Sequence, residues 1–328
     1  MTPKIAIIIL NWNGKKDTLE CLKSLKKINY PNYETILVDN GSTDDSVLHI
    51  REQFPSITLI ENKENLGFAE GNNRGIRYAL KKGVDLIFLL NNDTVIDPDI
   101  LNAFVKTFQL NPEAGVLGAK IYLFEKQDTL DHFGGNWNSS RGAFDFVGSK
   151  QLDDHASWEV PQEIDYVCGA GMMISANVFK AISLLEKDFF LIWEEADFCF
   201  RAKKAGFKVL TCPSAKIWHK VSASFSSKPH STYFWWRNRL LWIKRNCTKR
   251  EQLKLYITIL IPSILHLYKM QLLTLLQLFF KRTLTPQKNH QKKRAYLINN
   301  RAALQGVHDF FFSRFGNAPA WIYTIPSE

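Results

Sequence analysis

Several features that would place this chain in a specialised class are missing from its sequence. The 328 residues contain five cysteines, an odd number without a CxxC-like pair, so neither a disulfide framework nor a cysteine zinc site is indicated. The 17 glycines and 12 prolines follow no period, which excludes collagen-like and repeat folds. The first apolar run, residues 5–10, is too short for a signal peptide. We therefore expect a globular protein in the reducing cytoplasm.

Acidic residues are scarce in the last part of the chain. Residues 236–328 carry 16 Lys and Arg against 3 Asp and Glu, a net charge of +13, whereas residues 1–235 carry 26 against 29, a net charge of −3. A basic patch confined to one end fits an anionic surface. The Leu, Ile and Phe content of this tail favours lipid, and no nucleic-acid-binding motif such as a helix-turn-helix is found.

A long, purely apolar run is also missing. Residues 255–280 carry one charge, Lys269, but they also include Pro262, His266 and two glutamines. The segment is therefore long enough to span a membrane but less apolar than a typical spanning helix. We expect amphipathic helices lying in the membrane interface, and a helical subdomain or a dimer interface is the alternative. The basic residues expected to contact anionic lipid are Lys281, Arg282, Lys288, Lys292, Lys293 and Arg294.

Strand-like and helix-like patterns alternate along the first 240 residues. Apolar, β-branched runs predict strands at 5–10, 35–38, 57–60, 86–90, 115–121 and 167–175. Apolar residues at helical spacing predict helices near 19–28, 44–53, 69–82, 100–110 and 193–205. The Gly-, Asn- and Ser-rich stretch 131–157 is expected to be a long functional loop. This order predicts an α/β fold, with a mostly parallel central sheet and helices on both faces.

Polar residues follow the predicted strands, at the carboxyl ends where open α/β sheets bind ligands. Asn11 and Asn13 follow the first strand, and Asp39 follows the second, where it can bind a nucleobase or ribose or else cap a helix. Asp93 follows the fourth strand, and its carboxylate suits a hard divalent cation that also binds a diphosphate. His219 can complete such a site, since imidazole suits Mn²⁺ beside Mg²⁺, or it can be a structural hydrogen-bonding residue.

Two further segments carry the residue types of a reaction centre. Residues 65–75 enter a helix with three glycines, as backbone approaching a phosphate requires, and Arg74 can reach a diphosphate, although no P-loop Lys-Ser/Thr is present. Glu194, Glu195 and Asp197 lie within four residues at a helix start, where like charges raise one another's pKa as a general base needs. We expect Asp197 to pair with Arg201, which leaves the two glutamates free.

Taken in order, these motifs resemble the inverting glycosyltransferases of family 2 with the GT-A fold, most closely the rhamnosyltransferase-like branch. The resemblance divides the chain into a GT-A catalytic domain over residues 1–240 and a basic, apolar helical tail over residues 241–328. The segments that carry it are 11–14, 38–46, 65–75, 89–98, 166–175, 193–201, 213–222 and 233–239.

The resemblance also implies a role for each motif. Asp93 is the surviving acid of the Asp-x-Asp metal motif, because Asn91 occupies the first position, and it would hold Mg²⁺ or Mn²⁺ with His219. Glu195 is the catalytic base, with Glu194 as the fallback because the family usually has Glu-Asp here. The nucleotide contacts are Asn11, Asn13, Asp39, Gly67, Arg74 and Asn92, and the donor and acceptor sugar residues are Gly169, Ala170, Trp193 and Asp197.

The implied enzyme transfers one sugar from a UDP- or dTDP-linked donor to a lipid-linked or polysaccharide acceptor. It would work with inversion, bound peripherally to the inner face of the cell membrane, without nucleic acid; a homo-oligomer is left open. A processive synthase would carry a Gln-x-x-Arg-Trp motif, whereas residues 233–238 here read Tyr-Phe-Trp-Trp-Arg-Asn. A catalytically impaired transferase-like protein and a basic-tail binding protein are the remaining alternatives.

Overall fold

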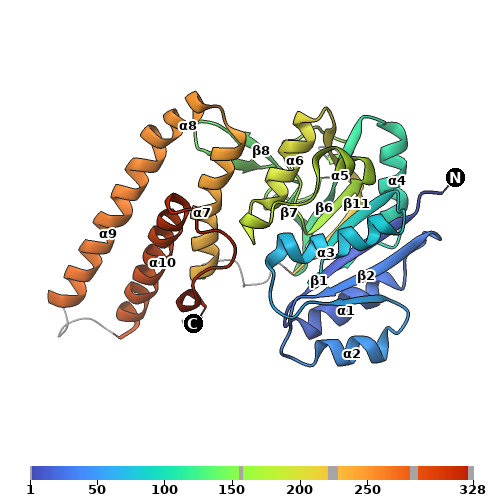
Figure 1. The fold of residues 1–328 in the computed structure, drawn as a ribbon, viewed down its shortest axis with the longest axis horizontal. Helices are drawn as coiled ribbons and strands as arrows, with labels where there is room; N and C mark the ends of the chain where they lie inside the picture. The colour runs from blue at the N-terminus through green and yellow to red at the C-terminus, as the bar shows by residue number, and fades with distance from the viewer. Residues whose placement is uncertain (1, 155–157, 221–227, 281–286, 324–328) are drawn as a thin grey trace. The chain divides into compact units, whose positions relative to one another are not determined.

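A nine-stranded mixed sheet forms the centre of the first part of the chain. The computed structural model describes residues 2–154, 158–220, 228–280 and 287–323. The strand order is β3-β2-β1-β4-β10-β6-β11-β5, with β7 paired to β6. Figure 1 labels β1, β2, β6, β7 and β11 of this sheet. The strands are β1 (Ile5–Asn11), β2 (Tyr33–Asp39), β3 (Thr58–Glu61), β4 (Leu86–Asn91), β5 (Thr94–Ile96), β6 (Ala114–Leu123), β7 (Lys126–His132), β10 (Gly171–Ser175) and β11 (Lys208–His219).

Most of these strands run in one direction. β3, β2, β1 and β4 are mutually parallel, β10 is antiparallel to both β4 and β6, and β11 is parallel to β6. The expectation of a mostly parallel α/β sheet is therefore confirmed. The helices that accompany it are α1 (Lys15–Leu25), α2 (Ser46–Gln53), α3 (Gly67–Lys81), α4 (Ile100–Leu110), α5 (Ala176–Ile182) and α6 (Glu194–Lys204).

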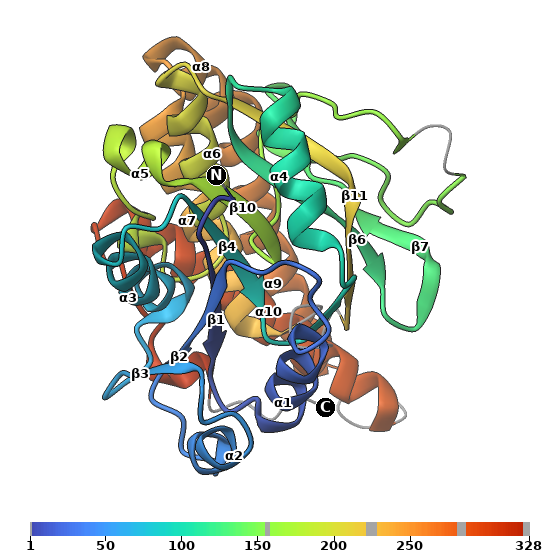
Figure 2. The ribbon, with the colours of Figure 1, turned by 90° about the vertical axis from the view of Figure 1, so that its right-hand side faces the viewer.

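Helices cover both faces of the sheet, which is why its central strands β1 and β4 are apolar along nearly their whole length. Figure 2 shows α3 on one side of β1 and β4, and α1 with α4 on the other. On the α3 face, Gly75 lies so close to Ile8 that an added Cβ would come within 2.7 Å of its side chain. On the opposite face, the Phe88 and Phe104 rings lie 5.2 Å apart within the core. Both faces of the sheet are therefore closed, and polar residues concentrate at its edges.

The stretch 131–157, expected to be a loop, contains regular structure. β7 extends to His132, and β8 (Gly135–Asn138) pairs with β9 (Ala143–Phe146) in a separate two-stranded sheet. The turn between them is held by Asn138, whose Oδ1 accepts hydrogen bonds from Ser140 N (3.0 Å) and Arg141 N (3.2 Å). Gly142 completes it at φ 58°. Asn, Ser and Gly, taken as loop signals, here serve one tight turn.

The chain divides into two compact units. The first comprises Met1–Trp137, Asp145–Phe190 and Glu194–Ser222, and the second comprises Asn138–Phe144, Leu191–Trp193 and Ala223–Glu328. The second unit contains α7 (Pro229–Asn246), α8 (Lys249–Leu255), a π-helical turn (Tyr256–Leu260), α9 (Ile261–Phe280) and α10 (Gln287–Phe311). The boundary predicted between residues 240 and 241 falls inside α7, because the apolar and aromatic residues of 229–246 form one continuous helix.

Packing inside the second unit explains the Tyr233–Arg239 motif. Tyr233 donates to Asp309 Oδ2 (2.8 Å), and Arg237 donates to the carbonyl of Gly316 (2.6 Å). Gly306 lets α10 approach α7, since a Cβ there would lie 2.5 Å from the Tyr233 carbonyl oxygen. Asn238 donates to the carbonyls of residues 191 (2.7 Å) and 192 (2.8 Å). The motif therefore stabilises the helical unit.

Candidate functional site

The carboxyl ends of β1, β2 and β4 are joined by a hydrogen-bond network centred on Asn11. Its buried side chain donates through Nδ2 to Asp39 Oδ1 (2.8 Å) and Ser42 Oγ (3.1 Å). Its Oδ1 accepts from Thr18 Oγ1 (2.7 Å) and Asn92 Nδ2 (3.4 Å). Parallel pairing places Asn11 directly beside Asp39. Three residues predicted to contact the nucleotide thus meet at one sheet edge, where ligands bind in open α/β folds.

A second set of hydrogen bonds shapes the turn after β2. Asp39 Oδ2 accepts from Ser42 N (2.9 Å), and Ser42 Oγ accepts from Asn13 N (2.9 Å). Asn13, at φ 51°, accepts from Thr43 N (2.7 Å) through Oδ1. Both Asp39 oxygens are therefore used to hold loops, and the carboxylate is 3 % exposed. A direct contact of Asp39 or Asn13 with a nucleotide remains a prediction.

Asn40 is a site residue that sequence reasoning missed. It is 1 % exposed, and its Nδ2 donates to Asn65 Oδ1 (2.9 Å) and to the Gly67 carbonyl (3.1 Å). Its Oδ1 accepts from Leu66 N (3.1 Å). Asn40 therefore links the end of β2 to the first turn of α3. The available signal was an amide beside Asp39 at the same strand end.

The glycines of residues 65–75 make room for protein atoms. Gly67 lies at φ +77°, and a Cβ there would come within 2.5 Å of the Phe190 carbonyl oxygen. That oxygen accepts from Phe68 N (2.6 Å). A Cβ on Gly71 would meet Leu10 at 2.6 Å. The expectation that a phosphate demands these glycines is corrected: close helix–sheet packing demands them, and a nucleotide contact at Gly67 remains a prediction.

Arg74 lies on the solvent-facing side of α3. Its side chain is 54 % exposed, and its Nε is 3.9 Å from Glu70 Oε1 one turn earlier. Glu70 is bound more closely by Arg77, at 2.7 Å. Arg74 is therefore an exposed cation two turns into the helix, and its contact with a diphosphate remains a prediction.

Asp93 and His219 form a close pair. His219 Nε2 lies 3.1 Å from Asp93 Oδ1, with the side chains only 13 % and 15 % exposed. Adjacent ligands of an octahedral ion with bonds of about 2.1 Å lie about 3.0 Å apart, so these two atoms fit neighbouring positions around Mg²⁺ or a similar ion. In the part of the chain that the structure describes, no three His, Cys, Asp or Glu side chains form a metal-ligand group. Oxygens from a bound diphosphate or water would therefore complete the shell.

Asp131, which sequence reasoning missed, lies on the other side of the His219 ring. Its Oδ2 is 3.8 Å from His219 Nδ1, a buried nitrogen with no hydrogen-bond partner among the described residues. Burial lowers the pKa of His219, but Asp131 and Asp93 outweigh it and raise that pKa to about 9. Burial likewise opposes ionisation of Asp93, yet His219 holds the pKa of Asp93 below its ordinary value. A carboxylate behind a metal-binding histidine is a recurrent arrangement in metal sites.

Glu194 and Glu195 open α6 and differ in exposure. Glu194 is 3 % exposed, whereas Glu195 is half-buried. Burial, followed by the charge of Glu195, raises the pKa of Glu194 well above its ordinary value. Burial and the neighbouring carboxylate therefore both disfavour a negative charge on Glu194. This difference favours Glu195 as the base, as predicted, over Glu194.

Gly169 and Ala170 connect the acidic helix to the end of β4. A Cβ on Gly169 would lie 3.0 Å from the Phe68 ring and 4.0 Å from Glu195 Cβ. The Ala170 carbonyl accepts from Asn91 N (3.1 Å), two residues before Asp93. The segment predicted to line the sugar subsites therefore runs from Glu195 toward the strand end that leads to Asp93.

Two predicted sugar contacts are instead occupied in packing. The Asp197 carboxylate is fully buried and paired with Arg201 (2.7 Å), as the sequence predicted for that pair. Trp193 is 6 % exposed, and its ring packs against Phe144 (5.4 Å) and Trp242 (5.8 Å) within the second unit. Neither side chain presents a free face to a sugar, so both expectations are corrected to structural roles.

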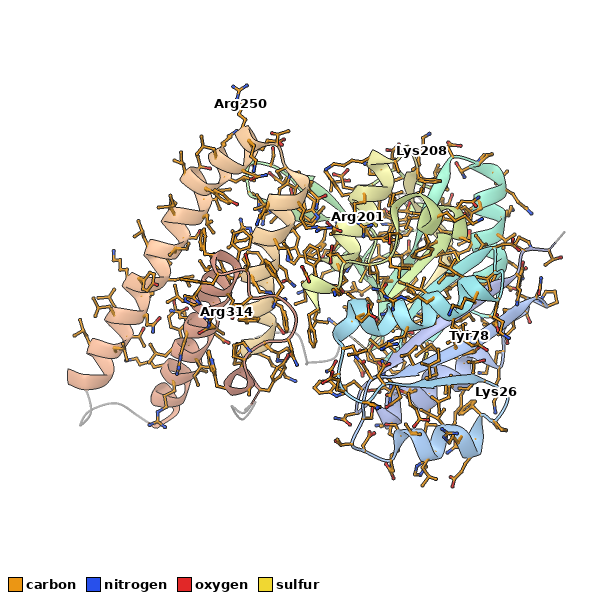
Figure 3. The ribbon with its side chains drawn as sticks, viewed as in Figure 1. Lys26, Tyr78, Arg201, Lys208, Arg250 and Arg314 are labelled. Atoms are coloured by element: carbon orange, nitrogen blue, oxygen red, sulfur yellow. The ribbon has the colours of Figure 1, made fainter. Side chains whose placement is uncertain are left out.

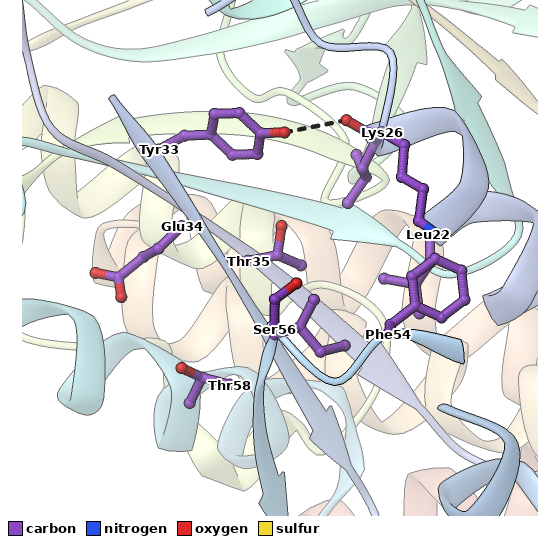
Figure 4. A pocket seen from close by; sticks show the side chains of 10 residues that line it. Leu22, Lys26, Tyr33, Glu34, Thr35, Phe54, Ser56 and Thr58 are labelled. Atoms are coloured by element: carbon purple, nitrogen blue, oxygen red, sulfur yellow. Dashed lines mark hydrogen bonds between the residues drawn. The ribbon is translucent and has the colours of Figure 1, made fainter. Parts of the chain in front are cut away.

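A cavity of about 320 Å³ lies elsewhere, between the end of α1, the start of β2 and residues 54–58, which lead from α2 into β3 (Figure 4). It is lined by residues including Leu22, Tyr33 and Phe54, and Tyr33 donates to the Leu25 carbonyl (3.2 Å). Tyr33 begins β2, whereas Asp39 ends it. This cavity is therefore at the opposite edge from the polar network and is separate from the candidate site.

Comparisons with known proteins identify the family of this chain. Residues 6–182 match the sequence profile of Glycosyl transferase family 2. The chain is 25 % identical over 251 residues to the low-salt glycan biosynthesis hexosyltransferase Agl10 of Haloferax volcanii, covering 74 % of this chain and 76 % of Agl10. It is 22 % identical over 280 residues to the N-acetylglucosaminyl-diphospho-decaprenol L-rhamnosyltransferase of Mycobacterium tuberculosis, covering 75 % of this chain and 90 % of that protein.

A solved structure shares the fold. The mannosyltransferase PcManGT from Pyrobaculum calidifontis, in complex with GDP-Man and Mn²⁺, aligns with a TM-score of 0.56 at 14 % identity, covering 96 % of this chain and 88 % of that one. At this identity the likeness speaks for the fold alone, and it confirms the predicted GT-A architecture.

Proposed function

Since the chain belongs to glycosyltransferase family 2 and is a glycosyltransferase, we propose that it transfers one sugar from a nucleoside-diphosphate sugar to an acceptor hydroxyl with inversion. The observation that carries this proposal is the approach of two different groups to the 169–170 segment. Glu195 lies against Gly169, and the strand end that leads to Asp93 is hydrogen-bonded to Ala170. A base and a metal-binding carboxylate thus flank one short stretch of backbone.

Each group of site residues has its own role in the proposed transfer. Glu195, the more exposed of the two glutamates, takes the proton of the acceptor hydroxyl. The hydroxyl oxygen then forms a bond to the anomeric carbon while the bond from that carbon to the diphosphate oxygen breaks, and a single displacement inverts the configuration. Asp93 and His219 would hold Mg²⁺ or Mn²⁺, which neutralises the leaving diphosphate when bound. Asn11, Asp39 and Asn92 keep the three strand-end loops rigid around the nucleotide.

We also propose a UDP- or dTDP-linked donor and a lipid-linked or polysaccharide acceptor at the cytoplasmic face of the membrane, in the synthesis of a cell-surface glycan. The support is the naming of one relative as a rhamnosyltransferase acting on a decaprenol diphosphate sugar and of another as a glycan biosynthesis hexosyltransferase. The odd number of cysteines, without a CxxC-like pair, fits a reducing compartment.

The first experiment is thermal unfolding of the protein with UDP, dTDP, GDP and CDP, each with and without MnCl₂. A ligand at 100 times its dissociation constant should raise the free energy of unfolding by about 2.7 kcal/mol. We expect one diphosphate to stabilise only with metal, and Asp93→Asn to abolish that effect. Sugar release from the corresponding labelled donor then tests catalysis. The absence of stabilisation by every diphosphate, together with no transfer, would contradict the proposal.

A further inference from the structure

An exposed apolar stripe runs along α8, the π-helical turn and α9 in the second unit. Its residues are 43 % to 63 % exposed although all but one are aliphatic. They recur every three or four positions, so they share one helix face. The stripe residues are Leu253, Ile257, Ile261, Leu265, Tyr268, Leu272 and Leu276.

The π-helical turn keeps this stripe straight. Residues 253, 257, 261 and 265 are four apart, a spacing that drifts around a regular α-helix with 3.6 residues per turn. The turn Tyr256–Leu260 is wider, with hydrogen bonds from residue i to i+5, and it absorbs part of that drift. The first half of the stripe therefore stays aligned with the second half on α9.

The other faces of these helices differ from the stripe. A second face carries exposed polar residues, and each of them directly follows a stripe residue in the sequence. These polar residues are Lys254, Thr258, His266 and Lys269. A third face is covered, since α9 packs on α10 and Leu260 is buried. The helical segment Lys249–Leu276 is long enough, and apolar enough over part of its length, to cross a membrane. A polar face from Lys254 to Lys269 instead fits a helix lying in the plane of an interface, and beyond it the exposed residues Leu273 and Leu275 widen the apolar surface.

Charge selects the partner of the stripe. Four cations, Lys249, Arg250, Lys254 and Lys269, accompany it, and the segment from 249 to 276 contains a single acid, Glu251. Glu251 is engaged in the capping box with Thr248 at the start of α8. Figure 3 shows Arg250 pointing away from the helices. Two copies joined through this stripe would bring like charges together, whereas anionic phospholipid supplies both apolar depth and negative charge.

We propose that this stripe is a monotopic membrane-binding surface, on which α8 and α9 lie parallel to an anionic bilayer. The apolar side chains enter the boundary between head groups and acyl chains, and the four cations contact lipid phosphates. Lys281 and Arg282, predicted lipid contacts, lie outside the described residues, as do the side chains of Lys288 and Lys292. The inference goes beyond the proposed transfer reaction and needs neither donor nor metal.

The test is flotation of the full-length protein with phosphatidylcholine vesicles and with vesicles containing 30 mol % phosphatidylglycerol. We compare wild type with Ile257→Gln/Leu265→Gln/Leu272→Gln, whose positions are all more than half exposed. The control is Leu48→Gln/Leu110→Gln, which changes leucines that are 56 % and 71 % exposed in the first unit. We expect the stripe variant to bind anionic vesicles about tenfold or more weakly, and the control to bind like wild type.

Each alternative gives its own result. Equal binding by the stripe variant and wild type overturns the proposal, as does retention of the protein in the bilayer after alkaline carbonate extraction, which would indicate a spanning helix. A dimer on light scattering that the stripe substitutions dissociate, without vesicle binding, would assign the surface to a second copy. Since thermal melts of the variants report folding and vesicle binding is read without substrate, failure here leaves the transferase proposal standing, and the reverse also holds.

Discussion

His219 Nε2 lies 3.1 Å from Asp93 Oδ1, and strand pairing sets this distance. His219 is the last residue of β11 and lies opposite Thr94 of β5 in an antiparallel ladder. Lys220 N donates to the Asp93 carbonyl (3.0 Å) and extends that ladder. Two residues far apart in the chain are thus held at the spacing of adjacent ligands by backbone hydrogen bonds, before any ion arrives. The spacing of the two side chains is therefore a property of the sheet, and the metal site proposed for them would be preorganised.

Asp131→Asn is expected to weaken Mn²⁺ binding by about 10- to 100-fold, the usual effect of removing a carboxylate that orients a ligand histidine. The measurement is the dissociation constant for Mn²⁺ from electron paramagnetic resonance, with Asp93→Asn as the variant expected to lose binding. Asp128→Asn is the control, since it changes an exposed carboxylate on the same strand. Identical Mn²⁺ affinity of the Asp131 and Asp128 variants would show that Asp131 has no part in the site.

Glu195→Gln should lower kcat by about 10²- to 10⁴-fold, because a carboxamide cannot take the acceptor proton. Glu194→Gln should lose far less, since Glu194 is already neutral and an amide can still donate to the neighbouring carboxylate. Initial rates with the donor identified by thermal unfolding measure both. Donor binding by the inactive variant is the control for folding. The opposite ranking of the two variants would assign the base to Glu194.

The raised pKa of Glu194 should also appear in the pH dependence of the free energy of unfolding. The pKa of Glu194 is raised in the folded protein, so the unfolded chain loses its proton first, and the free energy of unfolding falls as pH rises above about 4.3 toward the folded pKa. Glutamine does not titrate. The advantage of Glu194→Gln over wild type should therefore grow by about 1.4 kcal/mol per pH unit in that window, measured by urea unfolding. Parallel pH profiles would mean that Glu194 ionises normally.

Gly67→Ala is expected to destabilise the protein more than Gly83→Ala. Both residues have positive φ, at +77° and +67°, so both substitutions carry a backbone cost of about 1–2 kcal/mol. Only Gly67 adds a clash, at 2.5 Å from the Phe190 carbonyl, whereas nothing lies within 4 Å of a Cβ on Gly83. The free energy of unfolding of each variant isolates the clash by difference. Equal decreases in the free energy of unfolding of the two variants would show that the backbone around Gly67 and Phe190 relaxes at little cost.

Local patterns predicted much of the fold. The positions of β1 to β4, β6 and β10 and of α1 to α4 follow from apolar runs and their spacing, because both faces of a parallel sheet must be covered, whereas β5, β7 and α5 were not predicted. The hairpin at 135–146 was not predicted, because its Asn, Ser and Gly residues are typical of a loop, although a two-stranded sheet forms around them. The burial of Trp193 against Phe144 was not predicted, and neither was the complete burial of the Asp197–Arg201 pair. Both depend on tertiary partners that local spacing does not specify.

The sequence by itself determined the family, the α/β order and the strand-end positions of Asn11, Asp39 and Asp93, because residues next to a strand end are placed by covalent continuity alone. Only the tertiary structure decided that Asp131 stands behind His219, that Glu194 rather than Glu195 is buried, and that the glycines of α3 pack against Leu10 and the Phe190 carbonyl. Each of these depends on the register and close packing of segments distant in sequence, which local periodicity does not encode.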